Sequence, residues 1–302
     1  MPTPSETTQP QQWTALSAAP RRSVFGNYAA AAPAAAEESP AAACSLPGAA
    51  ASTNSPDKLI ELALARSFVY RFLAQAYEDP TSEGWAWLNN PETGSSLRAA
   101  SETCGLPPLT VPAGAAAGLL EFQDAYVATF GHAARGGCPL NEIEYGDIKA
   151  DPLFQPHRLA DLSAFYRAFG LEVTEDAGER QDHLCLELEF MCILAAKEAY
   201  SRENNLGPEP LSQCGDAQKK FLREHLGRWA PAFARRLAGA TAEPFLRALA
   251  DWTRVFIESE CLRLSVRPGS EDLLLRPVDE AAETMCGSCG LDQLPPGAAP
   301  AG

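Results

Sequence analysis

The stretch that decides the fold is residues 179–196, which read Glu179-Arg180-Gln181-Asp182-His183-Leu184-Cys185-Leu186-Glu187-Leu188-Glu189-Phe190-Met191-Cys192-Ile193-Leu194-Ala195-Ala196. From Leu184 onward every residue except two glutamates is apolar, and a run of this length favours a buried helix over a strand. Asp182 is placed to cap the first turn, where a carboxylate accepts unpaired backbone N–H groups and meets the positive end of the helix dipole. The sequence therefore predicts a central helix with Asp182 and His183 at its amino end.

Two interpretations of Asp182 and His183 stay open. Capping statistics favour an ordinary N-cap beside a surface histidine. A binding pair is the functional alternative, because a histidine beside a carboxylate can donate, accept or become charged near neutral pH. Glu187 lies four residues after His183 and shares its face, whereas Glu189 is turned by roughly 200° from Glu187 at about 100° per residue. The two glutamates are therefore not an acid–base pair.

Cysteines offer two further patterns. Cys185, Glu189 and Cys192 fall on one stripe of the predicted helix and could in principle hold a metal, although free cysteine is commonly a small buried hydrophobe. Cys286 and Cys289 have the spacing of a metal or redox pair, but a second ligand pair is missing. We expect no metal site, with Cys286 and Cys289 as the alternative.

Composition divides the chain into three parts. Residues 1–56 are rich in Ala, Pro, Ser, Thr and Gln, with too few large apolar residues to offset the entropy of ordering, so we expect a disordered tail. Residues 271–302 are again rich in Pro, Gly and Ala and predict a flexible acidic tail that carries the cysteine pair. Residues 57–270 remain as one folded domain.

Charge and cysteine content limit the partners and the compartment. The formal net charge is −15, which repels phosphate backbones and favours basic partners, so we expect no nucleic acid. The nine cysteines are odd in number and scattered, which favours a reducing cytoplasm over a secreted disulfide protein. Residues 21–25 superficially look like a twin-arginine signal but no apolar stretch follows, and no run of 18 apolar residues predicts membrane insertion.

Helical periodicity recurs along the whole central part. The pattern predicts helices over 57–79, 114–130, 157–169, 184–202, 214–238 and 243–261, and a short one near 96–103. Pro231 predicts a kink or junction in the fifth of these. Trp85 and Trp87 are expected in the core rather than along a ligand groove. Because no segment alternates as a strand does, the predicted architecture is an all-α globule.

The loop 132–156 is a second candidate site. It has no helical period and holds a string of carboxylates, and a long irregular loop inside a compact domain is usually functional or mobile. The glycines of residues 131–137 mimic the spacing of a phosphate loop without its lysine. GxGxxG, GxSxG and HExxH motifs are absent from the chain, which argues against nucleotide, hydrolase and zinc-protease chemistry.

Three motifs follow one another along the chain. They are Tyr126-Val127-Ala128-Thr129-Phe130-Gly131, then Pro139 followed by Glu142-Ile143-Glu144-Tyr145-Gly146-Asp147, then Asp182-His183-Leu184 followed by Glu187-Leu188-Glu189-Phe190-Met191. In this order they resemble the TorD/DmsD/NarJ family of redox-enzyme maturation chaperones. The resemblance spans roughly residues 57–262 and extends to members that serve type II enzymes of the dimethyl sulfoxide reductase class. Arg180 stands where the family motif Glu-Pro-x-Asp-His often has proline.

The resemblance implies a cytoplasmic, all-helical chaperone that is not an enzyme. Such a protein binds the twin-arginine signal peptide and the apo catalytic subunit of a molybdenum oxidoreductase until molybdopterin guanine dinucleotide is inserted. It holds no permanent cofactor, although transient contact with that cofactor or with guanine nucleotide is compatible with the family, and so is a homodimer formed by exchange at residues 204–213.

A signal peptide offers two arginines and an apolar stretch, so its binder needs carboxylates at one end of an aromatic groove. The residues expected to bind the client are Tyr126, Phe130, Pro139, Glu142, Tyr145, Asp182, His183 and Glu187, with Glu144, Asp147, Trp85 and Trp87 as additional candidates. Three rival functions stay open: a metal or redox protein using the cysteines, a nucleotide-binding protein using residues 131–137, and a generic helical adaptor.

Overall fold

The computed structural model describes residues 55–110, 118–131, 137–146, 154–173 and 179–276. The α-helices in these residues are α1 (Pro56–Tyr77), α2 (Ser82–Leu88), α3 (Pro91–Cys104), α4 (Leu119–Phe130), α5 (Phe154–Ala168), α6 (Leu184–Glu203), α7 (Pro208–Glu224), α8 (Leu226–Ala240) and α9 (Pro244–Arg263). Two isolated antiparallel bridges join residues that are both described, and no strand occurs in the described part. The prediction of an all-α fold is confirmed.

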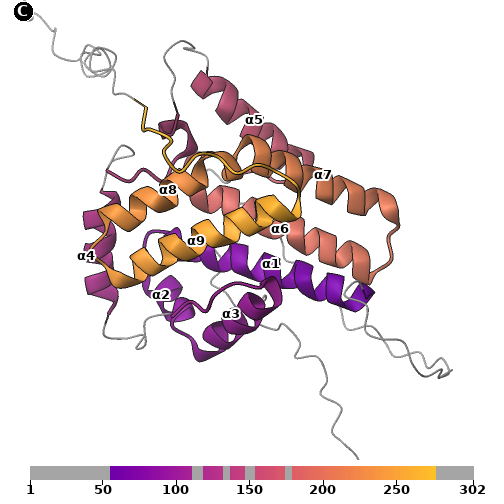
Figure 1. Ribbon diagram of the computed structural model, residues 1–302, viewed down its shortest axis with the longest axis horizontal. Helices are drawn as coiled ribbons and strands as arrows, with labels where there is room; N and C mark the ends of the chain where they lie inside the picture. Colours follow the sequence, from indigo (N-terminus) through magenta and orange to yellow (C-terminus); the bar gives the residue numbers. More distant parts are fainter. Residues whose placement is uncertain (1–54, 111–117, 132–136, 147–153, 174–178, 277–302) are drawn as a thin grey trace, which may run out of the picture.

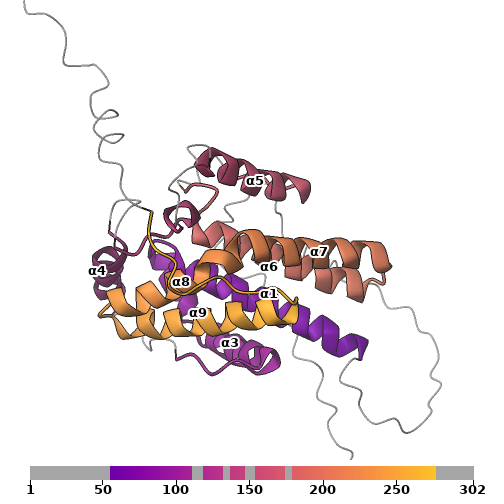
Figure 2. The same cartoon turned by 45° about the horizontal axis from the view of Figure 1, so that its top comes forward.

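Helices α1 and α6 form the centre of the molecule (Figure 1). α7 packs against α6, and α8 pairs with α9, while α3 covers α1 from the other side. Turning the molecule shows α5 at one side and α3 at the opposite side, with α1 and α6 between them (Figure 2). The apolar run from Leu184 to Ala195 is buried along most of its length, as a helix covered from several sides requires.

A buried ion cluster ties four helices together inside this core. Arg66 of α1 donates to Glu260 of α9 at 2.8 Å and to Glu198 of α6 at 3.1 Å. Gln218 of α7 also accepts from Arg66 and donates to Glu198 at 3.0 Å. Every charge in the cluster has a partner, which is the condition under which buried charge is tolerated.

Most predicted helix ends agree with the structure to within a few residues. The first helix, the helix before Gly131 and the last helix are confirmed as α1, α4 and α9. Trp85 and Trp87 are 4% and 7% exposed, so the prediction that they belong to the core is confirmed. Trp85 stacks on Phe122 with ring centroids 4.7 Å apart, which joins α2 to α4.

The predicted helix 214–238 is wrong, because the chain makes two helices there. The break falls at His225, between α7 and α8, and Pro231 lies inside α8. Gly227 permits the sharp turn, because a Cβ at that position would lie 2.4 Å from the carbonyl oxygen of Leu222. The junction therefore follows the glycine and not the proline.

After α9 the chain folds back across the molecule as an extended segment, residues 266–276, which we call the strap. The amide of Gly269 donates to the carbonyl of Gly227 at 2.9 Å, and this holds the strap on α8. Arg276 ends the described part of the chain. The strap is therefore the last segment that the structure describes.

Some sequence predictions lie outside the described residues. These are the predictions for residues 1–54 and 277–302, including Cys286 and Cys289, for Asp147, and for most of the glycine loop at 131–137. Of the helices that the structure describes, none is both long and apolar enough to cross a membrane. Within the same residues, no three His, Cys, Asp or Glu side chains are grouped in a way that could hold a metal ion, so Cys185, Glu189 and Cys192 do not form the metal site considered above.

Candidate functional site

The second and third sequence motifs meet in the structure. Residues 138–146, which we call the motif loop, run between the amino end of α6 and the strap. On one side Asn141 bridges to His183, and the amide of Leu184 donates to the carbonyl of Leu140 at 2.8 Å. On the other side Tyr145 bridges to Leu275. The loop is therefore held along both edges by backbone hydrogen bonds.

Asp182 is the central acceptor of this arrangement. Its carboxylate is fully buried and accepts from the amide of Ile143 at 3.2 Å and from Nδ2 of Asn141 at 3.3 Å. Arg180 adds a two-pronged contact, with Nε at 3.0 Å from one oxygen and Nη2 at 3.1 Å from the other. Asp182 thus fixes the motif loop and does not cap α6, so the predicted cap is wrong.

His183 is the N-cap of α6. Its Nδ1 accepts from the amide of Cys185 at 3.3 Å, and its Nε2 lies 3.6 Å from a carboxylate oxygen of Glu179. Burial lowers the pKa of His183, against the raising effect of Glu179 and Asp182. The ring is therefore neutral at neutral pH, and because Nδ1 accepts, its proton lies on Nε2 and faces Glu179.

Glu142 anchors the motif loop to α8 and α5. Its side chain is fully buried and lies 2.9 Å from Nδ1 of His225 and 3.0 Å from Nη2 of Arg228. Arg158 is 3.8 Å away. Burial alone would raise the pKa of Glu142, but the hydrogen bond with His225 and the charges of Arg228 and Arg158 lower it, so the carboxylate stays ionised.

Glu187 is the opposite case, a buried carboxyl group that hydrogen-bonds to an indole, although the charge of Arg228 still acts on it and lowers its pKa. Nε1 of Trp229 lies 3.2 and 3.1 Å from its two oxygens. Burial, followed by the negative charges of Glu142 and Asp182, raises the pKa of Glu187 well above its usual value. The fold therefore favours the protonated form of Glu187 more than water does, with the indole of Trp229 as its hydrogen-bond partner.

The predicted aromatic residues lie in the core. Tyr126 and Phe130 of α4 are 7% and 4% exposed and face each other with centroids 4.6 Å apart, and Tyr145 is fully buried against Trp229. The hydroxyl of Tyr145 donates to the carbonyl of Pro139 at 2.8 Å, inside the motif loop. Tyr145 therefore supports the motif loop from within, and all three side chains are buried rather than lining an open groove.

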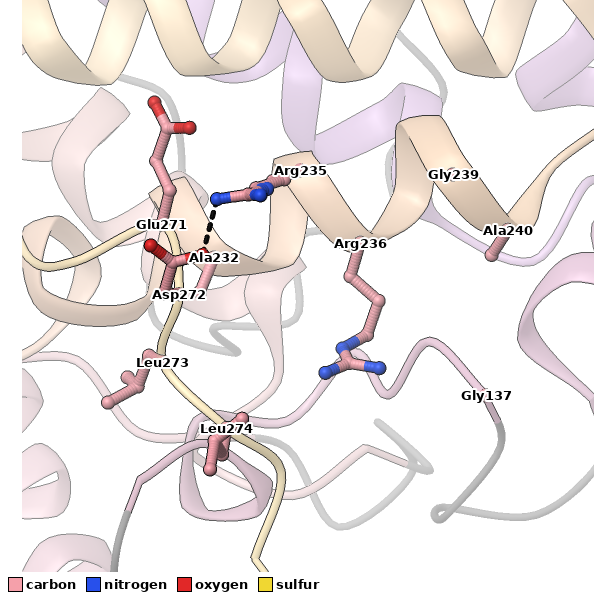
Figure 3. A pocket seen from close by; sticks show the side chains of 10 residues that line it. All are labelled: Gly137, Ala232, Arg235, Arg236, Gly239, Ala240, Glu271, Asp272, Leu273 and Leu274. Carbon is pink, nitrogen blue, oxygen red and sulfur yellow. Dashed lines mark hydrogen bonds and ion pairs between the residues drawn. The ribbon is translucent and has the colours of Figure 1, made fainter.

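A cavity of about 440 Å³ lies between α8 and the strap, and its lining includes Gly137, the residue before the motif loop. Figure 3 shows Arg236 extending from α8 into the space between that helix, Gly137 and Leu274, while Arg235 pairs with Asp272. The rest of the lining is made of small residues and the strap. The cavity thus lies beside the predicted site residues without containing them.

The structure thus brings six of the eight predicted site residues together: Pro139, Glu142, Tyr145, Asp182, His183 and Glu187. Tyr126 and Phe130 lie apart on α4, against α1 and α8. Sequence reasoning missed His225, Arg228 and Trp229 as partners of the two buried glutamates. The sequence did contain one indication of these partners. Glu142 has no lysine or arginine close to it in the chain, so if it is buried, its cation must come from a distant segment.

Comparison with known proteins agrees with this arrangement. A family model described as nitrate reductase delta subunit matches residues 91–235, which include the motif loop, the start of α6 and most of α8. The perchlorate reductase assembly chaperone protein of Dechloromonas aromatica (strain RCB) is 30% identical over 212 residues, which cover 66% of this chain and 90% of the relative.

Two other relatives match over shorter stretches. The selenate reductase assembly chaperone protein of Thauera selenatis is 38% identical over 79 residues, 26% of this chain and 39% of the relative. The chaperone protein TorD of Vibrio cholerae serotype O1 (strain M66-2) is 29% identical over 119 residues, 39% of this chain and 52% of the relative. The chain therefore belongs to the TorD/DmsD/NarJ family of redox-enzyme maturation chaperones, which assist assembly and are not enzymes.

Proposed function

We propose that this protein is a dedicated cytoplasmic chaperone for the catalytic subunit of a molybdenum oxidoreductase of the dimethyl sulfoxide reductase class. It binds the subunit's twin-arginine signal peptide and its apo form, and it releases them after cofactor insertion and before export. The observation that carries the proposal is the 90% coverage of a relative named as a perchlorate reductase assembly chaperone. Relatives named for selenate and chlorate reductases support the same class of client.

The contacts around the motif loop support this region as the binding site for the signal peptide. A client arginine needs a carboxylate that can pair with its guanidinium. Two carboxylates, Asp182 and Glu144, lie where the motif loop meets α6, and in this structure both lie within ion-pair distance of Arg180. The net charge of −15 favours encounter with a basic peptide. Molybdopterin guanine dinucleotide belongs to the client, and the proposal assigns it no residue of this chain.

The test is recovery of the client from the native host grown without oxygen. The tagged full-length chain is purified, and bound proteins are identified by mass spectrometry together with their amino-terminal peptides. The proposal expects a molybdenum enzyme subunit that still carries its signal peptide, and it expects the recovery of that subunit to fall when the coding sequence of the signal peptide is deleted from the gene. Recovery of nucleotide or metal without such a subunit would contradict the proposal.

A further inference from the structure

We propose that Arg180 occupies the client's arginine site in the free protein. The site is a guanidinium-binding pair formed by Asp182 and Glu144, and the proposed ligand is an arginine side chain of the client that displaces Arg180. This inference rests on the proposed function, because it names how the same site is kept closed until the signal peptide arrives.

The contact has the geometry that a bound arginine would have. Nε and Nη2 of Arg180 meet the two oxygens of Asp182 at 3.0 and 3.1 Å, which is the forked pairing of a guanidinium with a carboxylate. Nη2 also lies 3.7 Å from Glu144 of the motif loop. A guanidinium supplied by another chain would find the same two carboxylates in the same orientation.

Arg180 is the partner of Asp182 that can leave. Its side chain is 41% exposed, whereas Asp182 is fully buried and Asn141 is 7% exposed. The other donors to Asp182, the amide of Ile143 and the side chain of Asn141, belong to the motif loop and are fixed by its backbone pairing. Swinging Arg180 into solvent would therefore uncover the carboxylate without unfolding the loop.

The site requires a cation in either state. A buried carboxylate without a counter-charge is strongly unfavourable, so Asp182 cannot stand empty at low cost. Arg180 supplies the charge in the free protein, and a client arginine would supply it in the complex. Exchange of one guanidinium for the other leaves the number of buried charge pairs unchanged. Because the client's arginine must displace Arg180, the affinity for the client depends on how strongly Arg180 binds Asp182.

The exchange predicts that removing Arg180 strengthens client binding. In the Arg180→Ala variant, the buried carboxylate of Asp182 has lost the guanidinium that paired with it. An arginine of the client would supply that charge again and so gain free energy that it does not gain in the wild type. We expect a fluorescein-labelled signal peptide with adjacent arginines to bind the full-length Arg180→Ala variant about tenfold more tightly than the wild type, equivalent to about 1.4 kcal/mol. Fluorescence anisotropy measures the difference, and a peptide with lysines at both positions is expected to lose it, because lysine cannot make the forked contact.

Arg254→Ala is the matched control. Arg254 is 33% exposed and lies on α9, where it pairs with Glu258 at 3.1 Å and with Glu271 of the strap at 3.7 Å. Its replacement is expected to leave peptide affinity unchanged. Equal or weaker binding by Arg180→Ala, with helical circular dichroism retained, would overturn the inference.

A second measurement does not depend on the peptide. Millimolar methylguanidinium is added to the full-length wild type, Arg180→Ala and Arg254→Ala, and the midpoint of thermal unfolding is recorded against sodium at equal ionic strength. We expect a rise only in Arg180→Ala, because only that variant has a vacant guanidinium site and a ligand stabilises the state that binds it. No rise overturns the site. A rise without peptide binding by any variant keeps the site and contradicts the proposed function.

Discussion

The amide of Gly269 lies 2.9 Å from the carbonyl of Gly227 and completes a hydrogen bond that α8 cannot make for itself. In a regular helix that carbonyl accepts from the residue four positions later, which here is Pro231 and has no N–H. The proline therefore leaves an acceptor open on α8, and the strap takes it. Because the strap also pairs with Tyr145, this single contact helps fix the motif loop.

Gly269→Ala is expected to destabilise the protein by about 1–3 kcal/mol, the usual cost of forcing atoms into a packed site. A Cβ at Gly269 would lie 1.8 Å from the carbonyl oxygen of Arg228, so the strap must move away from α8. Urea unfolding measures the loss. Gly239→Ala, on α8, is the control. A Cβ at Gly239 would meet nothing within 4 Å, and alanine there is expected to stabilise the protein by about 0.5–1 kcal/mol.

Glu187→Gln is expected to stabilise the protein at neutral pH. The folded state raises the pKa of Glu187, mainly by burial, so it holds a proton that the unfolded chain releases. Stability is therefore lost as pH rises above the unfolded pKa of about 4.5, at about 1.4 kcal/mol for each unit up to the folded pKa. Glutamine stays neutral and avoids this loss.

Urea unfolding of Glu187→Gln and wild type between about pH 5 and pH 8 checks the sign of this linkage. The gain in the variant is expected to grow as pH rises. Glu203→Gln, at an exposed position near the end of the same helix, should give no such trend. A variant of Glu187 that is less stable than wild type at every pH would show that the carboxylate is ionised in the folded protein.

Glu260→Gln is expected to cost about 3–5 kcal/mol at neutral pH, because it removes one side of a buried ion pair. Burial alone would raise the pKa of Glu260, but Arg66 and Arg263 lower it to about 2, from a usual value of 4.5. The stability that the carboxylate contributes is complete above about pH 4.5 and declines as pH falls toward the folded pKa. The difference between variant and wild type in urea unfolding should therefore shrink on acidification, and a constant difference would contradict the ion-pair account.

Two substitutions of His183 distinguish its role as the N-cap of α6 from a role in binding the client. His183→Ala is expected to cost about 1 kcal/mol through loss of the N-cap, whereas His183→Asn keeps a good capping side chain and most of the stability. Thermal unfolding of both variants checks this. If His183→Asn also keeps full affinity for the signal peptide, the imidazole contributes only the cap. If it retains stability but loses affinity, the histidine contacts the client.

The helices were predictable from the sequence because their apolar positions repeat at the helical period over long segments. The long apolar run after His183 could hardly be anything other than a buried helix, and α6 is one. The break before α8 was not predictable in the same way. Periodicity continues across His225, and the deciding fact is the close approach of Leu222 and Cys261 to Gly227, which exists only in the folded protein.

The candidate site was predictable in membership but not in arrangement. Six of its residues do meet, yet spacing could not show that Asp182 faces the motif loop or that Arg180 pairs with it. The spacing also could not show that Tyr145 packs on Trp229, because 84 positions separate these two residues along the chain. The aromatic side chains were expected to line a groove because a bound signal peptide requires apolar walls. They lie in the core instead, because burying their large apolar area stabilises the folded chain.

The central claim is that this chaperone recognises a signal peptide by its arginines. The most direct measurement is calorimetric titration of the full-length wild type with the signal peptide of the host's molybdenum enzyme, beside its lysine-substituted version and an unrelated amphipathic peptide. We predict saturable binding of one peptide per chain, weakened at least about tenfold, or about 1.4 kcal/mol, by lysine and absent with the unrelated peptide. Equal binding of all three peptides, or no binding of any, would contradict the claim.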